Sequence, residues 1–316
     1  LKRKSIEPLA AAMDPLHVAA KHQSLHHFVA KSNWSDSALL REVRTVVEPV
    51  LGLERECYWI IDDTGIPKQG KHSVGVTRQY CGQLGKTENC QVAVSLSLAS
   101  DKGSLPIQWR LYLPEDWTED RPRCTAAGVP DGIPFATKIE IALAQIKQAQ
   151  DDGVPAGIVL ADPAYGDSAS FRDTLTEMAI PYAVGIRSAT SVWAPGTAPL
   201  PPEPTVGLGR PSKNLRRAPG HRPVSVKALA LSLPAEAYQT VAWREGTNET
   251  LRSRFAAVWG HTAHKDSSRN TLRPPEWLLI EWPLGDTEPL KYFLATAPAD
   301  TSLAQLVYVT KMRWRI

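Results

Sequence analysis

The sequence predicts an α/β fold in which a mixed β-sheet is flanked by helices. Short apolar runs bounded by Gly, Pro and Asp predict buried strands, because strands are shorter than helices and end at turn-forming residues. Residues 135–150 place apolar side chains on one helical face, and Gly153 follows, which predicts a helix and its end. In the region 53–190 the segments follow as three strands, a helix, a strand, a helix and a strand, an order that favours helices on both faces of a sheet.

The predicted strands of this region differ in their expected burial. The runs 57–61 and 157–161 are apolar almost throughout, so both are predicted to be buried strands. Residues 91–98 alternate polar and apolar side chains, which indicates a half-buried strand. The predicted strands are 57–61, 91–98, 107–113, 157–161 and 182–187, and the predicted helices are 135–150 and 168–178.

The flanking regions have a different character. The first fifty residues have helix-forming composition, and residues 35–43 have a polar start followed by apolar residues at helical spacing. Eight of the 26 prolines fall between Pro195 and Pro223, which excludes a regular helix or central strand there. Strand-like runs follow this segment. We therefore predict four parts: a helical region 1–52, a core 53–190, a Pro-rich linker with a basic β-rich insertion 191–298, and the start of a C-terminal helix 299–316.

Both buried strands lead into aspartates. The first ends in Asp62 and Asp63, and the second ends in Asp162. Two neighbouring strands can bring such carboxylates together, and carboxylate oxygens are the ligands that magnesium needs for phosphodiester chemistry. The alternative is that each Asp simply begins a turn, a common role for this residue.

The charge distribution favours a nucleic-acid partner more than the total charge does. The net charge is only +3, but residues 204–273 hold twelve Lys or Arg against four acids. A basic module of this kind is typical of DNA contact, with a solvated Arg-rich face as the alternative. The predicted loop 64–89 has no acid before Glu88 and carries several basic residues that we expect to contact phosphates, unless it is merely a surface loop. These residues are Lys68, Lys71, His72, Arg78 and Lys86.

Other classes of protein are not favoured. No apolar run reaches the ~18 residues of a membrane span, and no signal peptide opens the chain, so we expect a cytoplasmic protein without membrane contact. Because the chain begins with Leu1, we expect that its N-terminus is clipped. The four cysteines form no Cys-x-x-Cys pair, so we expect reduced thiols.

An ordered set of motifs resembles the DDE transposases of bacterial insertion sequences, in the insertion sequence 4-like superfamily and its 701-type branch. In that family an Arg-Trp-x-Ile stretch immediately precedes the catalytic Glu, and here Arg313, Trp314 and Ile316 match it at the end of the chain. The residue three positions before the Arg is often Tyr in the family and is Thr310 here. Besides the two aspartate motifs, the resemblance rests on residues 5–8, 22–29, 34–36, 68–75 and 78–86.

The resemblance implies an RNase H-like core in which the first and fourth strands are neighbours. It implies Asp63, which directly precedes Thr64, as a bridging ligand of two Mg²⁺ ions, with Mn²⁺ as a substitute, and Asp162 as the second ligand. Asp62 alternates with Asp63 along the strand and is expected to point to the other face. Asp167 is expected to cap the next helix, with Ser168 as a competing cap.

The resemblance also implies function and partners. The expected activity is metal-dependent cleavage and strand transfer at the terminal inverted repeats of a transposon, by a homodimer on double-stranded DNA near the bacterial nucleoid. Arg187 and Arg313 join the basic residues of 64–89 as expected DNA contacts. The third acidic ligand would directly follow Ile316, so we expect the chain as given to fold and bind DNA but not to cut at a useful rate. A non-catalytic DNA-binding remnant and a non-transposing RNase H-like nuclease are the alternatives.

Overall fold

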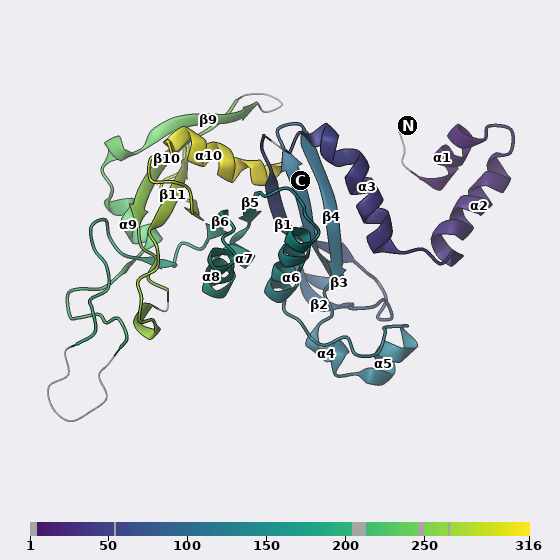
Figure 1. Ribbon diagram of the computed structural model, residues 1–316, viewed down its shortest axis with the longest axis horizontal. Coiled ribbons are helices and arrows are strands. Elements are labelled where there is room, and N and C mark those ends of the chain that lie inside the picture. Colours follow the sequence, from purple (N-terminus) through teal and green to yellow (C-terminus); the bar gives the residue numbers. More distant parts are fainter. Residues whose placement is uncertain (1–4, 54, 204–212, 246–249, 265) are drawn as a thin grey trace. The chain divides into compact units, whose positions relative to one another are not determined.

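The structure is a computed structural model that describes residues 5–53, 55–203, 213–245, 250–264 and 266–316 (Figure 1). The chain divides into two compact units, Leu1–Val46 and Val47–Ile316. The first unit contains α1 (Ile6–Met13), α2 (Val18–Lys31) and most of α3 (Asp36–Leu51), so the helices expected at the start of the chain are present. No helix among the described residues is long and apolar enough to cross a membrane.

The second unit is built on one large mixed sheet. Its strand order is β2-β3-β1-β5-β6-β12-β11-β10-β9, and β4 pairs with β3 beside this path. The strands are β1 (Tyr58–Pro67), β2 (Thr77–Cys81), β3 (Lys86–Ser100), β4 (Gly103–Leu111), β5 (Ile158–Ala161), β6 (Tyr182–Ile186), β9 (Gln239–Glu245), β10 (Thr250–Gly260), β11 (Glu276–Pro283) and β12 (Lys291–Ala295), with a small separate pair of β7 (Ser191–Val192) and β8 (Val224–Ser225).

The centre of the sheet has the predicted RNase H-like arrangement. β1 is antiparallel to β3, which is antiparallel to β4, whereas β5 lies parallel to β1 and to β6. The neighbouring positions of the first and fourth predicted strands, β1 and β5, are therefore confirmed by the pairing of Tyr58 with Ile158 and Ile60 with Leu160. The fold class, a mixed sheet flanked by helices, is likewise confirmed.

The segment after the first apolar run is not the loop that the sequence predicted. β1 continues past Asp62 and Asp63 to Pro67, and every residue of this extension pairs with β3. β2 then adds a further strand at the edge of β3. The prediction was wrong because antiparallel backbone hydrogen bonding does not require apolar side chains. The two aspartates thus lie within a strand and not at its end.

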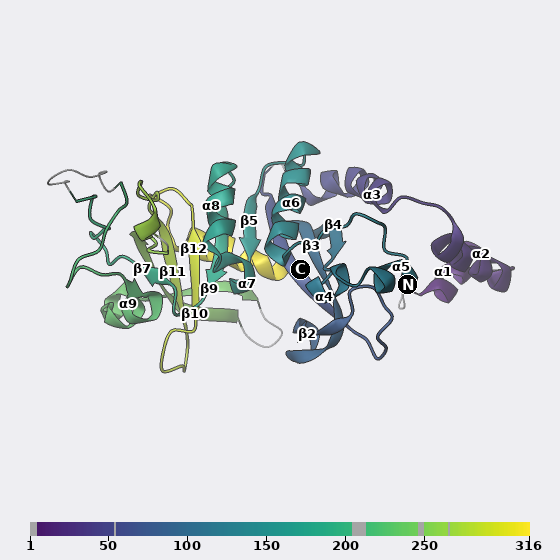
Figure 2. The same ribbon diagram turned by 90° about the horizontal axis from the view of Figure 1, so that it is seen from below.

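Helices cover both faces of this sheet (Figures 1 and 2). One face carries the core cluster that holds Trp59 and Ile61 of β1 together with residues of α6 (Lys138–Asp151), α8 (Ala169–Glu177) and α9 (Val226–Ser232), and the other face carries the cluster that holds Tyr58 and Ile60 together with residues of α10 (Leu303–Lys311). The other α-helices among the described residues of the unit are α4 (Glu115–Thr118), α5 (Arg121–Ala126) and α7 (Pro163–Gly166), and α10 continues as a 3₁₀ turn over Met312–Arg315.

The strands that follow the Pro-rich segment extend the same sheet. β12 pairs antiparallel with β6, and β11, β10 and β9 follow it outward. The predicted core and insertion therefore share one sheet within one compact unit. The boundaries of the four predicted parts stay predictions.

An ion-pair cluster ties the inserted region to the core. Asp173 of α8 accepts hydrogen bonds of 2.9 Å from Arg269 and from Arg273, and Arg273 also donates to the His264 carbonyl. Burial raises the pKa of Asp173, but the hydrogen bond and charge of Arg273 and the charge of Arg269 outweigh it, so the pKa lies below its usual value.

We expect Asp173→Asn to lower the free energy of unfolding at pH 7 by about 1.5–3 kcal/mol, the usual contribution of hydrogen bonds to charged groups. Because the folded-state pKa is lowered, this contribution is present above the unfolded pKa of about 3.9 and is lost as pH falls through the folded pKa. Urea denaturation of both proteins at pH 7 and in steps down to about pH 3 measures this. A difference that stays constant with pH would contradict the assignment, and Asp151→Asn, at an exposed acid on α6, is the control.

Candidate active site

Asp62 and Asp63 lie next to each other on β1 but face opposite sides of the sheet. Asp62 continues the face of Tyr58 and Ile60, and Asp63 continues the face of Trp59 and Ile61. Their backbones pair with Ser95 and Val94 of β3. The alternation expected from the sequence therefore holds, and it directs each carboxylate toward a different helix.

Asp162 follows β5 directly, so the parallel pairing of β5 with β1 places it beside the two aspartates of β1. It is the N-cap of α7, and its Oδ1 accepts a 2.9 Å hydrogen bond from the Ala164 N–H. A short polar side chain is favoured at this position because it satisfies an unpaired donor of the helix. The cap engages Oδ1 of the carboxylate, so Oδ2 is left to contact other groups.

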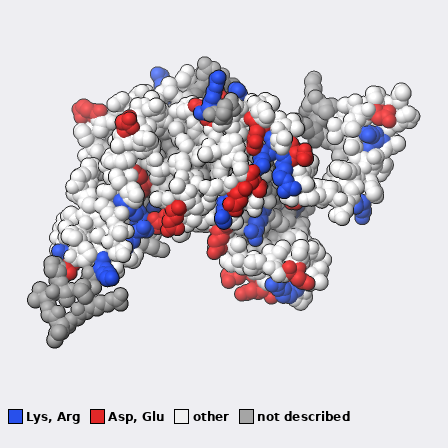
Figure 3. Space-filling view, viewed as in Figure 1, with Lys and Arg blue, Asp and Glu red and all other residues white. Residues whose placement is uncertain are grey.

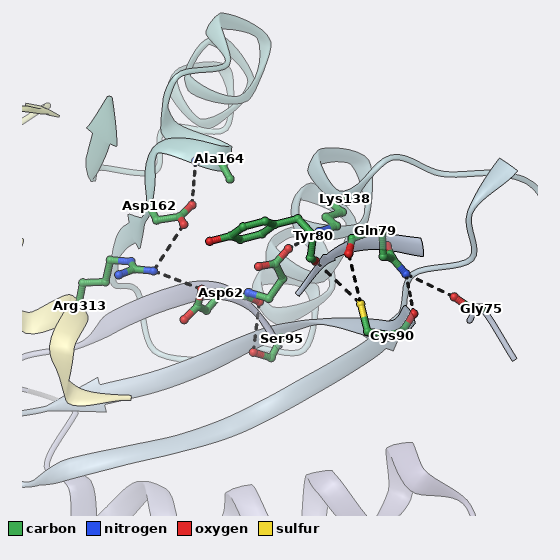
Figure 4. Close-up of polar contacts among 11 residues, drawn as sticks. Asp62, Gly75, Gln79, Tyr80, Cys90, Ser95, Lys138, Asp162, Ala164 and Arg313 are labelled. Carbon is green, nitrogen blue, oxygen red and sulfur yellow. Dashed lines mark hydrogen bonds and ion pairs between the residues drawn. The ribbon is translucent and has the colours of Figure 1, made fainter. Parts of the chain in front are cut away.

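Arg313 joins Asp62 and Asp162 (Figure 4). Its Nη2 lies 3.2 Å from Oδ1 of Asp62 and 3.8 Å from Oδ2 of Asp162. Arg313 belongs to the 3₁₀ turn after α10, so a residue more than 150 positions from either strand completes this contact. Burial raises the pKa of Asp62, and the charges of Asp162 and Asp63 add to this. Arg313 and the Asp63 N–H oppose the increase, but the pKa remains above its usual value.

Asp63 has a different partner. Its Oδ2 accepts a hydrogen bond from the ammonium group of Lys138 at 2.5 Å, and both side chains are largely covered. Lys138 is the first residue of α6, which lies on this face of the sheet. Asp62 and Asp162 therefore share the guanidinium group of Arg313, whereas Asp63 is paired with the ammonium group of Lys138.

Tyr165 lies among all three carboxylates. Its side chain is 1% exposed, and its hydroxyl group has no hydrogen-bond partner among the described residues. Burial raises the pKa of Tyr165, and the charges of Asp63, Asp162 and Asp62 raise it further. A buried hydroxyl group without a partner is costly, so its position suits a site that receives a further polar group.

The carboxylates of Asp62, Asp63 and Asp162 are chemically suited to bind a divalent cation. Carboxylate oxygens are preferred ligands of Mg²⁺, and the two cationic side chains now neutralise the charge that a metal ion would neutralise. Among the described residues, no group of three or more His, Cys, Asp or Glu side chains is arranged to hold a metal ion. The described part of the chain thus supplies carboxylates from β1 and β5 that converge on Arg313 and Tyr165.

The expected DNA-contacting residues of 64–89 are spread along the edge of the sheet. Lys68 follows β1, and its backbone N–H and carbonyl both bond to Asn89 at the start of β3. Lys71 and His72 are exposed in the connection to β2, where the Lys71 carbonyl accepts a hydrogen bond from Arg123. Arg78 is exposed on β2. These side chains are accessible, and their contact with DNA stays a prediction.

Arg187 and Asp167 lie close to each other after β6 and α7. Arg187 is 72% exposed in its side chain, and its Nε is 3.9 Å from Asp167. Asp167 accepts hydrogen bonds from the Arg187 N–H and the Thr190 hydroxyl, whereas Ser168 is the N-cap of α8. The cap expected of Asp167 is therefore wrong, because Asp167 is engaged by the segment that follows β6.

Much of the basic charge counted in 204–273 is paired internally. Arg217 bonds to buried Asp266, Lys227 pairs with Glu288, and Arg269 and Arg273 bind Asp173. On the face seen in Figure 3, Lys and Arg side chains lie intermixed with Asp and Glu side chains. The count of charges within residues 204–273 overstated the free positive surface. It could not include Glu288 and Asp173, which lie outside this segment and pair with its basic residues. Arg210, Lys265 and Glu249 lie outside the described residues.

Sequence reasoning missed Lys138 and Tyr165. A signal for Lys138 was available, because Thr137 and Glu140 form a capping box that fixes the first residue of α6. For Tyr165 the signal was its place one turn after Asp162 at the start of a short helix. Neither pattern identifies the partner, which depends on long-range pairing.

The chain resembles known proteins in sequence. The sequence profile of the family described as DDE superfamily endonuclease matches residues 1–250. A probable transposase for insertion sequence element IS701 from Microchaete diplosiphon is 36% identical over 189 residues, which are 60% of this chain and 46% of that protein. The chain thus matches less than half of the relative's length. The NurA nuclease from Sulfolobus solfataricus aligns over 86% of this chain and 83% of its own with a TM-score of 0.31 and 8% identity, a likeness too low to support an argument.

Proposed function

Since the chain belongs to the DDE superfamily endonucleases, we propose that it acts as the nuclease part of an insertion-sequence transposase, which cuts DNA at transposon ends and joins them to a target in a metal-dependent reaction. The observation that carries this proposal is the convergence of carboxylates from two adjacent parallel strands, β1 and β5, in a region that also holds Arg313 and the Tyr165 hydroxyl, which has no hydrogen-bond partner in the described part of the chain. The identity with a probable transposase supports the choice of DNA as substrate.

Asp63 and Asp162 are the proposed ligands of two Mg²⁺ ions, for which Mn²⁺ would substitute. Such ions activate the nucleophile and stabilise the leaving oxygen of an in-line displacement at phosphorus. Asp63 is preferred over Asp62 because it directly precedes Thr64, as the family resemblance expects. The acidic residue expected after Ile316 would complete the set of three carboxylates.

The remaining residues of the proposed site would bind and orient DNA. Arg313 lies beside the carboxylates, where its guanidinium group can balance their negative charge. A guanidinium group can also donate two parallel hydrogen bonds to a phosphate, so Arg313 could contact DNA instead. Basic side chains that are exposed or partly exposed would hold the phosphate backbone, in a dimer that pairs the two transposon ends. These side chains are Lys68, Lys71, His72, Arg78 and Arg187.

Cleavage of a transposon-end duplex in Mg²⁺ tests the proposal, with this chain compared with one extended beyond Ile316. We expect cleavage by the extended chain and a loss of more than about 100-fold in Asp63→Ala and in Asp162→Ala, because even the outer-shell partners of metal ligands contribute about 10- to 100-fold. Asp151→Ala, an exposed acid on α6, is the matched control.

The other outcomes separate the alternatives. Cleavage by the shorter chain would mean that another carboxylate completes the site, and Asp62 would be the first candidate because it already shares Arg313 with Asp162. Salt-sensitive DNA binding without cleavage by either chain would favour a non-catalytic DNA-binding remnant. Metal-dependent cutting without strand joining would favour a non-transposing nuclease.

A further inference from the structure

Lys138 is the residue that pairs with Asp63. Its Nζ lies 2.5 Å from Oδ2 of Asp63, with side-chain exposures of 30% and 24%. The two residues are 75 positions apart in the sequence and come from different elements, α6 and β1. Partial burial makes this pair stronger than an exposed ion pair, because water screens it less.

The position of Lys138 is fixed by the structure around it. Thr137 is the N-cap of α6, its hydroxyl accepts from the Glu140 N–H, and the Glu140 carboxylate accepts from the Thr137 N–H in return. The helix is further tied to the sheet by buried Gln145, which donates to the Val94 carbonyl directly opposite Asp63 on β3. The start of α6 is therefore held over Asp63, and the Lys138 side chain reaches it from there.

We propose that Lys138 is a positioning residue that occupies the metal-binding oxygen of Asp63 and is exchanged for a divalent cation when the site is loaded. This inference rests on the proposed role of Asp63 as a metal ligand. An ammonium group hydrogen-bonded to Oδ2 takes up one lone pair of that oxygen and repels a metal ion at the same carboxylate, so the two cations compete for Asp63. Lys138 thus keeps Asp63 oriented before a metal ion binds and lowers the affinity of that site for metal.

Exchange also gives Lys138 a second role in the loaded site. Once displaced from Asp63, its ammonium group would remain next to the carboxylates on a flexible four-carbon side chain. An anionic phosphate of bound DNA is the group that such a freed cation would contact. Metal loading and DNA binding would then support each other through one side chain.

Binding of Mn²⁺ to the DNA-free chain tests the exchange, with free Mn²⁺ followed by electron paramagnetic resonance. We expect Lys138→Met to tighten the apparent affinity for Mn²⁺ by ~3- to 10-fold. The variant removes the ammonium group that competes with Mn²⁺ for Asp63, and this factor corresponds to the free energy of a partly covered ion pair. Lys138→Arg keeps the charge, so its affinity should stay close to that of the unaltered chain. Lys147→Met is the matched control, since Lys147 is exposed on the same helix.

The outcomes that overturn the inference are distinct from those that overturn the proposed function. Unchanged or weaker Mn²⁺ affinity in Lys138→Met, at a site that Asp63→Asn abolishes, would refute the exchange and leave the metal site intact. A tighter affinity that persists in the Asp63→Asn/Lys138→Met double variant would also refute it, because the gain must pass through Asp63. Absence of any Asp63-dependent Mn²⁺ binding would overturn the exchange together with the proposed metal site.

Discussion

Replacing Lys311 by methionine is expected to lower the free energy of unfolding by about 3–5 kcal/mol, the usual cost of breaking a buried ion pair from one side. Lys311 lies on α10, and its Nζ donates to Oε2 of Glu281 at 2.7 Å, with both side chains 3% exposed. Burial lowers the pKa of Lys311, and the Glu281 carboxylate opposes this by favouring the charged form. Among the described residues, the variant would leave that buried carboxylate with the Ser253 hydroxyl as its remaining side-chain partner.

The pair also links α10 to the inserted strands and so supports the position of Arg313 two residues later. The ammonium group lies 4.4 Å from the Trp243 ring centroid, which adds a cation–π contact. We therefore expect Lys311→Met to weaken Mn²⁺ binding as well as stability. Urea denaturation followed by tryptophan fluorescence measures the stability of the second unit, because Trp34 is the sole tryptophan before Val47.

A double variant separates the charge effect from a packing effect. Lys311→Met combined with Glu281→Leu removes both charges, and such replacements are often neutral or stabilising. We expect it to recover most of the loss. Lys147→Met, which breaks an exposed pair with Asp151, should cost less than about 0.5 kcal/mol. A small loss in Lys311→Met, or no recovery in the double variant, would contradict the assignment of a buried ion pair.

Gly166→Ala is expected to destabilise the second unit by about 1–3 kcal/mol, the cost of overpacking a close contact. A Cβ at Gly166 would lie 2.7 Å from the Cβ of Val184 and closer still to the Gly185 carbonyl oxygen on β6. Gly166 ends α7, the short helix capped by Asp162. Since α7 would have to move away from β6, the Asp162 carboxylate would shift with it, and metal affinity should fall along with stability.

Gly82→Ala is the matched control for this substitution. A Cβ at Gly82 would meet no atom within 4 Å, and its φ is not in the left-handed region. Thermal unfolding and Mn²⁺ binding should both stay close to those of the unaltered chain. Equal effects of Gly82→Ala and Gly166→Ala on either measurement would mean that the close approach of α7 to β6 does not position Asp162.

Hydrophobic patterning predicted the strands that are buried on both faces and missed those held mainly by backbone pairing. The run 57–61 contains the start of β1, and the run 157–161 contains the whole of β5. Both were predicted correctly because their side chains, such as Ile60 and Leu160, are fully buried at the centre of the sheet. The polar extension of β1 to Pro67 has no such signal, since its hydrogen bonds to β3 are indifferent to side-chain polarity. Alternation along one strand likewise could not reveal that β12 joins the inserted strands to β6.

The site was predictable in its carboxylates and unpredictable in their partners. Asp63 and Asp162 follow from motifs at strand positions, and the parallel pairing of β1 with β5 brings those positions together. The pairing of Asp62 with Arg313 spans 251 positions, and that of Asp63 with Lys138 spans 75. Such contacts depend on how α10 and α6 pack on opposite faces of the sheet, which no local pattern encodes.

The location of bound Mn²⁺ tests the central claim most directly, by anomalous diffraction from crystals of the chain grown or soaked with the ion. We predict density bonded to carboxylate oxygens of Asp63 and Asp162 at close to the ~2.0–2.1 Å of Mg²⁺–oxygen bonds, with the Lys138 ammonium moved away from Asp63. Density between Asp62 and Asp162, with Asp63 still on Lys138, would contradict the choice of Asp63. Absence of density at all three carboxylates at saturating Mn²⁺ would contradict a metal site in this chain.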